Sequence, residues 1–146
     1  MTISVTDYFM GRRETHSLAC SPTIERNAAR TVGLVNGLLA RALAAGVVEP
    51  LTPAGAGQGT QLTSGWRPPD INACTSGASA TSLHMTGEAA DVFDPGDKLD
   101  AWLMSGPGQA VLIELGLWLE HPRDTPGWAH VQIRPPGSGR RVFYAK

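Results

Sequence analysis

Several features that would assign a chain to a broad functional class are missing from this sequence. Its 146 residues include 12 Lys and Arg against 13 Asp and Glu, which leaves a net charge of −1. Nucleic-acid binding usually needs a strong basic excess, so we expect no nucleic-acid partner. No apolar run approaches the roughly 18–20 residues that span a bilayer, so we expect no membrane segment either.

A secretory signal and a cysteine framework are missing as well. Residues 1–13 include Asp7, Tyr8 and Arg12 and have no apolar signal-peptide core, so we expect synthesis in the cytoplasm. Cysteine occurs only at Cys20 and Cys74. Without a secretory signal we expect two thiols, with a disulfide as the less favoured alternative.

The composition that is present indicates one loop-rich globular domain over residues 1–146. Hydrophobic residues make up 42% of the chain and charged residues 17%, which argues against disorder. The pattern divides into an N-terminal helical part, 1–50, and a core with the chemistry-bearing residues, 60–146. In the first part, Ser21-Pro22 is a helix start, apolar residues follow at spacings of three and four, and Gly46 supplies a stop.

The second part alternates short apolar segments with turns, which predicts an α+β fold with helices packed on a small, mostly antiparallel sheet. Helices are expected after a cap at Asp94 and again near Val111 to Leu115. Loops are expected at Pro50 to Gly59 and at 72–81. Strands are expected over residues 61–66, 89–93, 117–120, 129–133 and 142–144.

The most informative stretch is Ser82-x-His84-x-x-Gly87-x-Ala-x-Asp91. Gly87 allows a sharp turn, so that His84 on a loop and Asp91 on the following strand can converge. His130, near the start of a later strand, could join them. Two imidazoles and one carboxylate form a three-ligand zinc site with a fourth position open to water, as in hydrolytic zinc enzymes.

A structural interpretation of the same residues is available. A single histidine in such a chain is usually a surface or core residue, and Asp91 could be a buried, hydrogen-bonded carboxylate. The complete pattern of five fixed residues, however, is expected by chance in only roughly one in ten thousand chains of this length. We therefore predict Zn²⁺ at His84, Asp91 and His130.

These motifs resemble the zinc D-Ala-D-Ala peptidase family, which includes carboxypeptidases, dipeptidases and phage endolysins. Residues 63–72 are similar to its Ser-Gly-aromatic-Arg segment, 82–91 to its first metal motif, and 128–131 to its last, in the family's order over about half the chain. Residues 7–12 and 139–144 resemble a phage and prophage branch. The resemblance implies the family's hedgehog-like fold.

The resemblance also implies roles for individual residues. His84, Asp91 and His130 would be the zinc ligands. Arg67 would bind the substrate carboxylate or the developing oxyanion, which suits its planar, permanently charged fork. A surface residue beside two prolines is the alternative for Arg67. Ser82 and Trp128 are expected at the substrate site, with Ser82 forming a turn or supporting a ligand rather than acting as a nucleophile.

The general base is the least determined part of the prediction. Several family members carry Glu-x-x-His, but here the glutamate position is Gly127. Glu120 is the best substitute, because antiparallel pairing of its strand with the strand of His130 would bring the two together. A solvated strand end is the alternative for Glu120, and Glu88 and His121 are reserve candidates.

The expected function is a zinc metallopeptidase acting on the peptidoglycan stem peptide or cross-bridge, as a carboxypeptidase or an endolysin-type endopeptidase. We expect a monomer that reaches the cell wall during lysis or as a virion component. A competing hypothesis is a zinc-stabilised virion or interaction domain that kept the fold and lost the activity. The missing glutamate at Gly127 is its main support.

Overall fold

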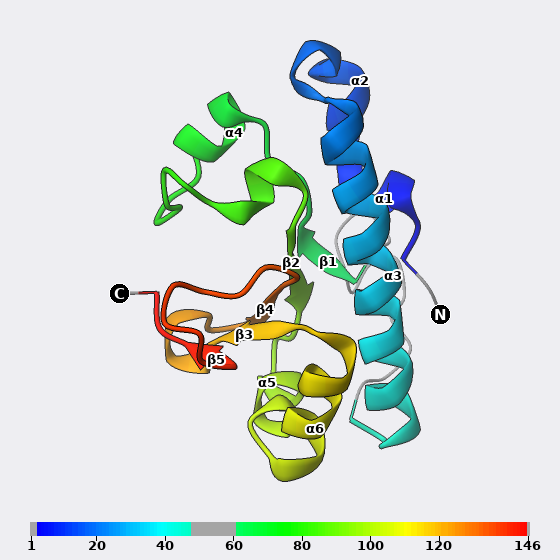
Figure 1. Ribbon diagram of the computed structural model, residues 1–146, viewed down its shortest axis with the longest axis vertical. Coiled ribbons are helices and arrows are strands. Elements are labelled where there is room, and N and C mark those ends of the chain that lie inside the picture. The colour runs from blue at the N-terminus through cyan, green and yellow to red at the C-terminus, as the bar shows by residue number, and fades with distance from the viewer. Residues whose placement is uncertain (1–2, 48–60, 146) are drawn as a thin grey trace.

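A five-stranded sheet organises the protein, whose computed structural model describes residues 3–47 and 61–145 (Figure 1). Its strand order is β1-β2-β4-β3-β5. Three neighbouring pairs are antiparallel, and β5 runs parallel to β3. The predicted α+β class with a mostly antiparallel sheet is therefore confirmed. The strands are β1 (Leu62–Ser64), β2 (Ala89–Phe93), β3 (Trp118–Glu120), β4 (Trp128–Gln132) and β5 (Val142–Phe143).

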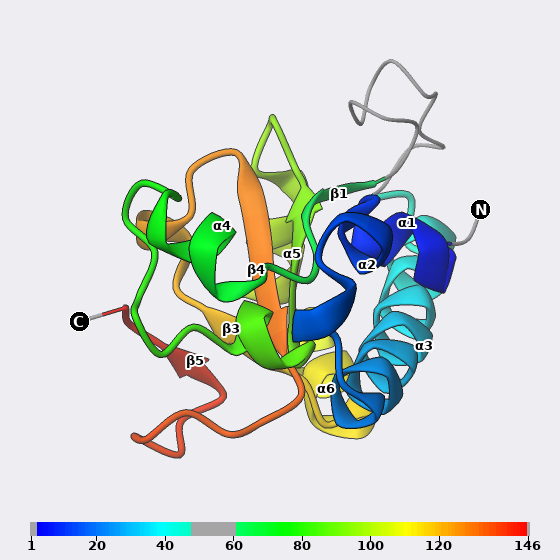
Figure 2. The ribbon, with the colours of Figure 1, turned by 90° about the horizontal axis from the view of Figure 1, so that it is seen from above.

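Helices cover one face of this sheet, and the view from above shows the long α3 beside α6 on that side (Figure 2). As predicted, α3 begins after Ser21, whose side chain accepts a hydrogen bond from the Ile24 amide, with Pro22 in the first position. No helix in the described residues is long and apolar enough to cross a membrane. The helices are α1 (Val5–Phe9), α2 (Arg12–Thr15), α3 (Pro22–Ala44), α4 (Pro69–Ala73), α5 (Lys98–Leu103) and α6 (Gly106–Leu115), with short 3₁₀ turns at η1 (Ser17–Ala19), η3 (Leu83–Thr86) and η4 (Pro122–Asp124).

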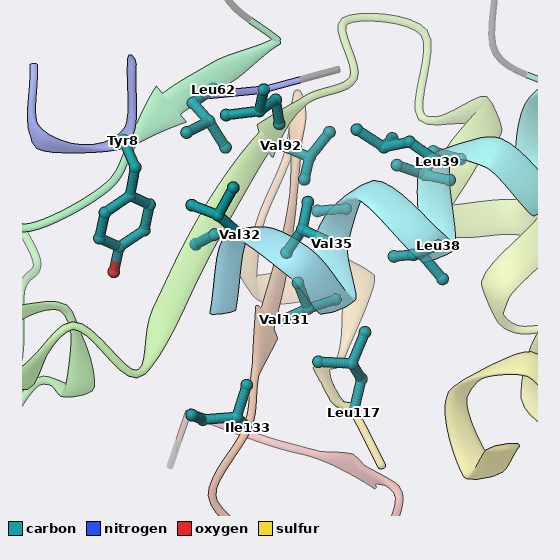
Figure 3. Packing of buried hydrophobic residues seen from close by; sticks show 14 of the residues in the cluster. Tyr8, Val32, Val35, Leu38, Leu39, Leu62, Val92, Leu117, Val131 and Ile133 are labelled. Carbon is teal, nitrogen blue, oxygen red and sulfur yellow. The ribbon is translucent and has the colours of Figure 1, made fainter. Parts of the chain in front are cut away.

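The hydrophobic core lies between α3 and the sheet (Figure 3). Val35 and Leu39 of α3 point toward Val92 of β2 and Val131 of β4, and all four are at most 2% exposed. Alternate residues of a strand point to opposite faces, so the neighbours of Val92 and Val131 along their strands face away from the helices. The core therefore determines which side chains remain for the other face of the sheet.

Several element boundaries differ from the expectations. The region 69–73, partly inside an expected loop, forms α4 because Pro68 and Pro69 start a helix as well as they end a strand. Helix α5 begins at Lys98 after Asp97, not at Pro95, although the Asp94 carboxylate does accept amide hydrogen bonds from that helix. Helix α6 starts at Gly106, earlier than expected. The expected loop Pro50 to Gly59 lies outside the described residues.

The contact between α5 and α6 yields a stability prediction. A Cβ added at Gly108 would lie 2.0 Å from the Trp102 carbonyl oxygen and 2.5 Å from Leu103 Cα, whereas one at Gly106 meets nothing within 4 Å. We expect Gly108→Ala to lower the free energy of unfolding by about 3 kcal/mol through overpacking. Gly106→Ala, in the same helical turn, should change it by less than about 0.5 kcal/mol. Urea denaturation measures both, and equal stability of the two variants would contradict this packing.

Candidate metal centre

The sheet register places three sequence-predicted residues side by side. Asp91 of β2 pairs directly with His130 of β4. On the other side of β4, Trp118 pairs with Gln132 and Leu119 with Val131, so one further step along β3 brings Glu120 beside His130. Directly paired residues share a face, and here it is the face opposite the core. Three adjacent strands thus present Asp91, His130 and Glu120 together.

His84 reaches the same point from the turn that precedes β2. It lies in η3, which Ser82 caps: the Ser82 hydroxyl oxygen accepts a hydrogen bond from the His84 amide. The turn ends at Gly87, whose φ of 79° belongs to the left-handed region that favours glycine. The expected sharp turn at Gly87 is therefore present. The His84 and His130 rings meet edge to face, with centroids 5.2 Å apart.

One ring nitrogen of His84 is held by the backbone, which determines its tautomer. Nδ1 lies 2.8 Å from the Gly65 carbonyl oxygen, which can only accept, so Nδ1 carries the proton and donates. The lone pair of the neutral ring is therefore on Nε2. This atom is buried without a hydrogen-bond partner and lies 3.2 Å from Asp91 Oδ1. A buried nitrogen lone pair that faces a carboxylate and has no hydrogen-bond donor is available to a metal ion.

Gln132 determines the tautomer of the second histidine in the same way. Its Nε2 donates to the Arg134 carbonyl oxygen, which directs Oε1 toward His130 Nε2 at 3.0 Å. His130 Nε2 therefore donates, and the lone pair of the neutral ring is on Nδ1, 2.8 Å from Asp91 Oδ1. Two acceptors at this distance require a cation between them, either a second ring proton or a metal ion.

The three residues therefore fit a metal ion as an N, N, O donor set. Their ligand atoms lie within 4.8 Å of one another, and all three residues are buried. Burial lowers the pKa of His84, which keeps that ring neutral. Burial alone would raise the pKa of Asp91, but the two histidines hold it well below its usual range. The pKa of His130 is raised, because its interactions with Asp91 outweigh the effect of burial.

Arg67 lies beside this centre, held by the turn of His84. Its amide donates to the His84 carbonyl oxygen, and its Nη2 donates to Ser82 Oγ at 3.1 Å. Only 9% of Arg67 is exposed, and its Nε is buried without a partner. Burial lowers its pKa, and the charge of Asp91 opposes that shift. Ser82 thus forms the turn and orients Arg67, consistent with the expected supporting role.

A single cleft of about 930 Å³ collects the predicted site residues. Its lining includes the three candidate ligands His84, Asp91 and His130. The lining also includes residues of the C-terminal segment 136–145 and small polar residues of the 76–82 loop. The sequence-predicted residues in the lining are Arg67, Ser82, His84, Asp91, Glu120, Trp128 and His130.

Glu120 is better placed than the reserve candidates to exchange protons in this cleft. Burial raises its pKa, and the nearby charge of His130 partly offsets that shift. Glu88, by contrast, is held by Arg134 and Thr86 and is not in the cleft lining. His121 is not in the lining either, and its ring accepts a hydrogen bond from the Arg123 amide. A carboxylate with a raised pKa is a stronger base than a fully exposed one.

The backbone explains why the alternative glutamate position is a glycine. Gly127 has a φ of 91°, where any residue with a side chain is strained. Its amide donates to Asp97 Oδ1, and its carbonyl oxygen accepts from the Asp94 amide. These bonds hold the turn before β4 in a conformation that suits glycine and not glutamate.

Two orienting groups were missed at the sequence level. Gln132 could have been found, because it lies two residues from His130 and so on the same face of β4. The Gly65 carbonyl oxygen is a backbone atom, so no residue type in the sequence could have indicated it.

Two imidazoles and one carboxylate suit Zn²⁺, and three protein ligands leave a fourth position free. Neither the protein-family models, nor the curated proteins, nor the solved structures include a match to this chain.

Proposed function

We propose that this protein is a zinc metallopeptidase that hydrolyses peptide bonds of bacterial peptidoglycan. The observation that carries the proposal is the convergence of His84 Nε2 and His130 Nδ1 on the Asp91 carboxylate at a cleft that Arg67 also lines. The motif resemblance to zinc D-Ala-D-Ala peptidases supports the same activity and suggests their hedgehog-like fold. The substrate would be the stem peptide or a cross-bridge.

The proposed chemistry assigns one task to each group. His84, Asp91 and His130 would hold Zn²⁺, which when bound polarises a carbonyl and lowers the pKa of water. Arg67 would bind the substrate carboxylate or the developing oxyanion with its free N–H groups. Glu120 would accept a proton from the attacking water and pass it to the leaving amine.

Orientation of the ligands is a separate task, which the backbone and Gln132 perform. Hydrogen bonds from both histidines to acceptors outside the centre hold the rings in place before any ligand binds. Such partners increase ligand basicity and metal affinity. Trp128, half-buried in the cleft wall, would contact the substrate beside β4.

Peptidoglycan digestion by the zinc-loaded protein and by Arg67→Lys tests the proposal. The wild type should release amino groups, and mass spectrometry of the products identifies the bond. Arg67→Lys should bind zinc normally but lose turnover by roughly 10²-fold or more, because an ammonium cannot reproduce the two-bond grip. A lysine variant with unchanged kinetics would assign Arg67 a structural role only.

A second candidate function is a zinc-stabilised virion or interaction domain without activity. Gly127 favours it, since that position lacks the glutamate that several zinc D-Ala-D-Ala peptidases carry. The same digestion separates the two functions. Bound zinc with no amino-group release from several wall types would favour the inactive domain and overturn the peptidase.

A further inference from the structure

A second group of acidic side chains belongs to the segment in which β2 leads into α5; Figure 1 shows this connection. Asp94 directly follows β2, Asp97 precedes α5, and Asp100 lies in the first turn of that helix. One carboxylate oxygen from each lies within 4.8 Å of the other two. Asp94 and Asp100 are buried, whereas Asp97 is exposed and opens the group to solvent.

The negative charge of this group has no basic partner. Among the described residues, no Lys, Arg or His forms an ion pair with any of the three. Backbone amides stabilise two of the three carboxylates: Leu99 and Asp100 donate to Asp94, and Gly127 donates to Asp97. Three carboxylates at this separation repel one another unless a cation joins them.

Asp100 has a buried carboxylate oxygen to which no described group donates a hydrogen bond. Its residue is 1% exposed, and its Oδ1 is buried with no hydrogen-bond partner. Its Oδ2 has only a long contact, 3.4 Å, from the Thr125 hydroxyl. A buried carboxylate oxygen without a donor is costly, and native proteins normally pair such atoms with a donor or a metal.

Protonation of Asp100 is the alternative to cation binding for neutralising its charge. Burial and the charge of Asp94 raise the pKa of Asp100 to about 7. One proton, however, would leave the charges of Asp94 and Asp97 facing each other. A divalent cation would be met by all three carboxylates at once, and the solvent side of Asp97 leaves room for waters. Ca²⁺ takes six to eight oxygen ligands of this kind in flexible geometry.

We propose that Asp94, Asp97 and Asp100 form a binding site for a divalent cation, with Ca²⁺ as the best-suited ion. The site would tie the start of α5 to the turn before β4, since Asp97 already holds Gly127 and Asp100 contacts Thr125. Trp128 and His130 follow that turn. Calcium would therefore stabilise the strand that carries one side of the cleft.

Thermal unfolding with and without calcium tests this site. The protein is freed of metals, loaded with one equivalent of Zn²⁺, and unfolded in rising concentrations of CaCl₂ and, separately, MgCl₂. Saturating Ca²⁺ should raise the Tm by about 5 °C or more, because it binds the folded state only. Mg²⁺ should have a smaller effect, and titration calorimetry should give one calcium site. The absence of any shift or heat would leave the proton as the neutralising cation and overturn the proposal.

Two isosteric variants assign the effect to these residues. Asp100→Asn should abolish the calcium shift and raise the calcium-free Tm, since it removes a buried unpaired charge. If Asp100→Asn does not fold, Asp97→Asn is the second test of the site. Asparagine tolerates the left-handed backbone at position 97, and its side-chain oxygen can still accept a hydrogen bond from the Gly127 amide. Asp97→Asn should weaken calcium binding at least tenfold. Unchanged calcium binding in these variants would place the ion elsewhere and overturn the proposal.

Two control variants separate this site from the proposed zinc centre. Glu114→Gln removes one exposed acidic charge, paired with Arg41 on another surface, and should leave the calcium shift unchanged. His84→Ala should lose zinc but keep the calcium shift. A calcium shift that disappears in His84→Ala would mean that the ion acts through the zinc ligands and not through the three aspartates.

Discussion

Replacing His84 by alanine is expected to remove nearly all of the zinc that the purified protein binds. The side chain supplies the unpartnered Nε2 lone pair, and a site reduced to Asp91 and His130 holds zinc poorly. Asp91→Asn should have a similar effect, since it removes the charge that both histidines face. Elemental analysis of metal content after dialysis, with competition against a chromogenic chelator, measures both losses.

A matched histidine control makes this result specific. His121 lies outside the cleft lining and stacks on Tyr144, with ring centroids 4.7 Å apart. His121→Ala should therefore keep full zinc stoichiometry. Near-stoichiometric zinc in both His84→Ala and Asp91→Asn would show that the zinc is bound elsewhere.

Gln132 offers a graded version of the same measurement. Its amide oxygen accepts from His130 Nε2 and so orients the ring without reaching the centre itself. Gln132→Met keeps the volume and removes the acceptor. We expect zinc affinity to fall by roughly 10–100-fold, the usual effect of losing such an orienting partner. An intermediate affinity, between those of His121→Ala and His84→Ala, would support the assigned tautomer of His130.

Glu120→Gln is expected to lower the rate of peptide hydrolysis by roughly 10²–10⁴-fold while zinc stays bound, the usual effect of removing a positioned acid–base group. The glutamine preserves shape and removes basicity. The reason lies in the register of β3 and β4, which brings Glu120 beside His130, and in burial, which raises the pKa of the carboxyl. Steady-state kinetics on a defined wall peptide measure the change in kcat.

The pH profile distinguishes a lost base from a disturbed cleft. A carboxylate base acts only above its pKa, so the wild-type rate should fall as pH drops through the raised pKa of Glu120. That acidic limb should vanish in Glu120→Gln. Asp124, the other acidic side chain beside β3 in the cleft lining, already accepts from the Ala145 amide. A large rate loss in Asp124→Asn with near-normal turnover in Glu120→Gln would transfer the role of base to Asp124.

Local pattern was sufficient to predict the long helix and one of the central strands of this fold. The spacing of apolar residues after Ser21-Pro22 predicted α3, and the short apolar segment 89–93 predicted β2 with the bounds that the structure has. Short segments were predicted less well. The five residues of α4 begin with the second of two prolines, and their helix depends on packing against η3 as well as on propensity. Parallel pairing of β5 with β3 depends on a distant chain segment that no local pattern encodes.

The candidate site divides in the same way. By itself the sequence determined which side chains could form the proposed zinc centre, because the motif around Gly87 requires a sharp turn that brings His84 and Asp91 toward each other. Only the tertiary structure decided which ring nitrogens face Asp91, since that depends on the Gly65 carbonyl oxygen and on Gln132. It also decided that Glu120 lies beside His130, and that the carboxylates of Asp94, Asp97 and Asp100 lie close together. The physical reason is that tautomers, strand register and uncompensated charge arise from contacts between residues far apart in sequence.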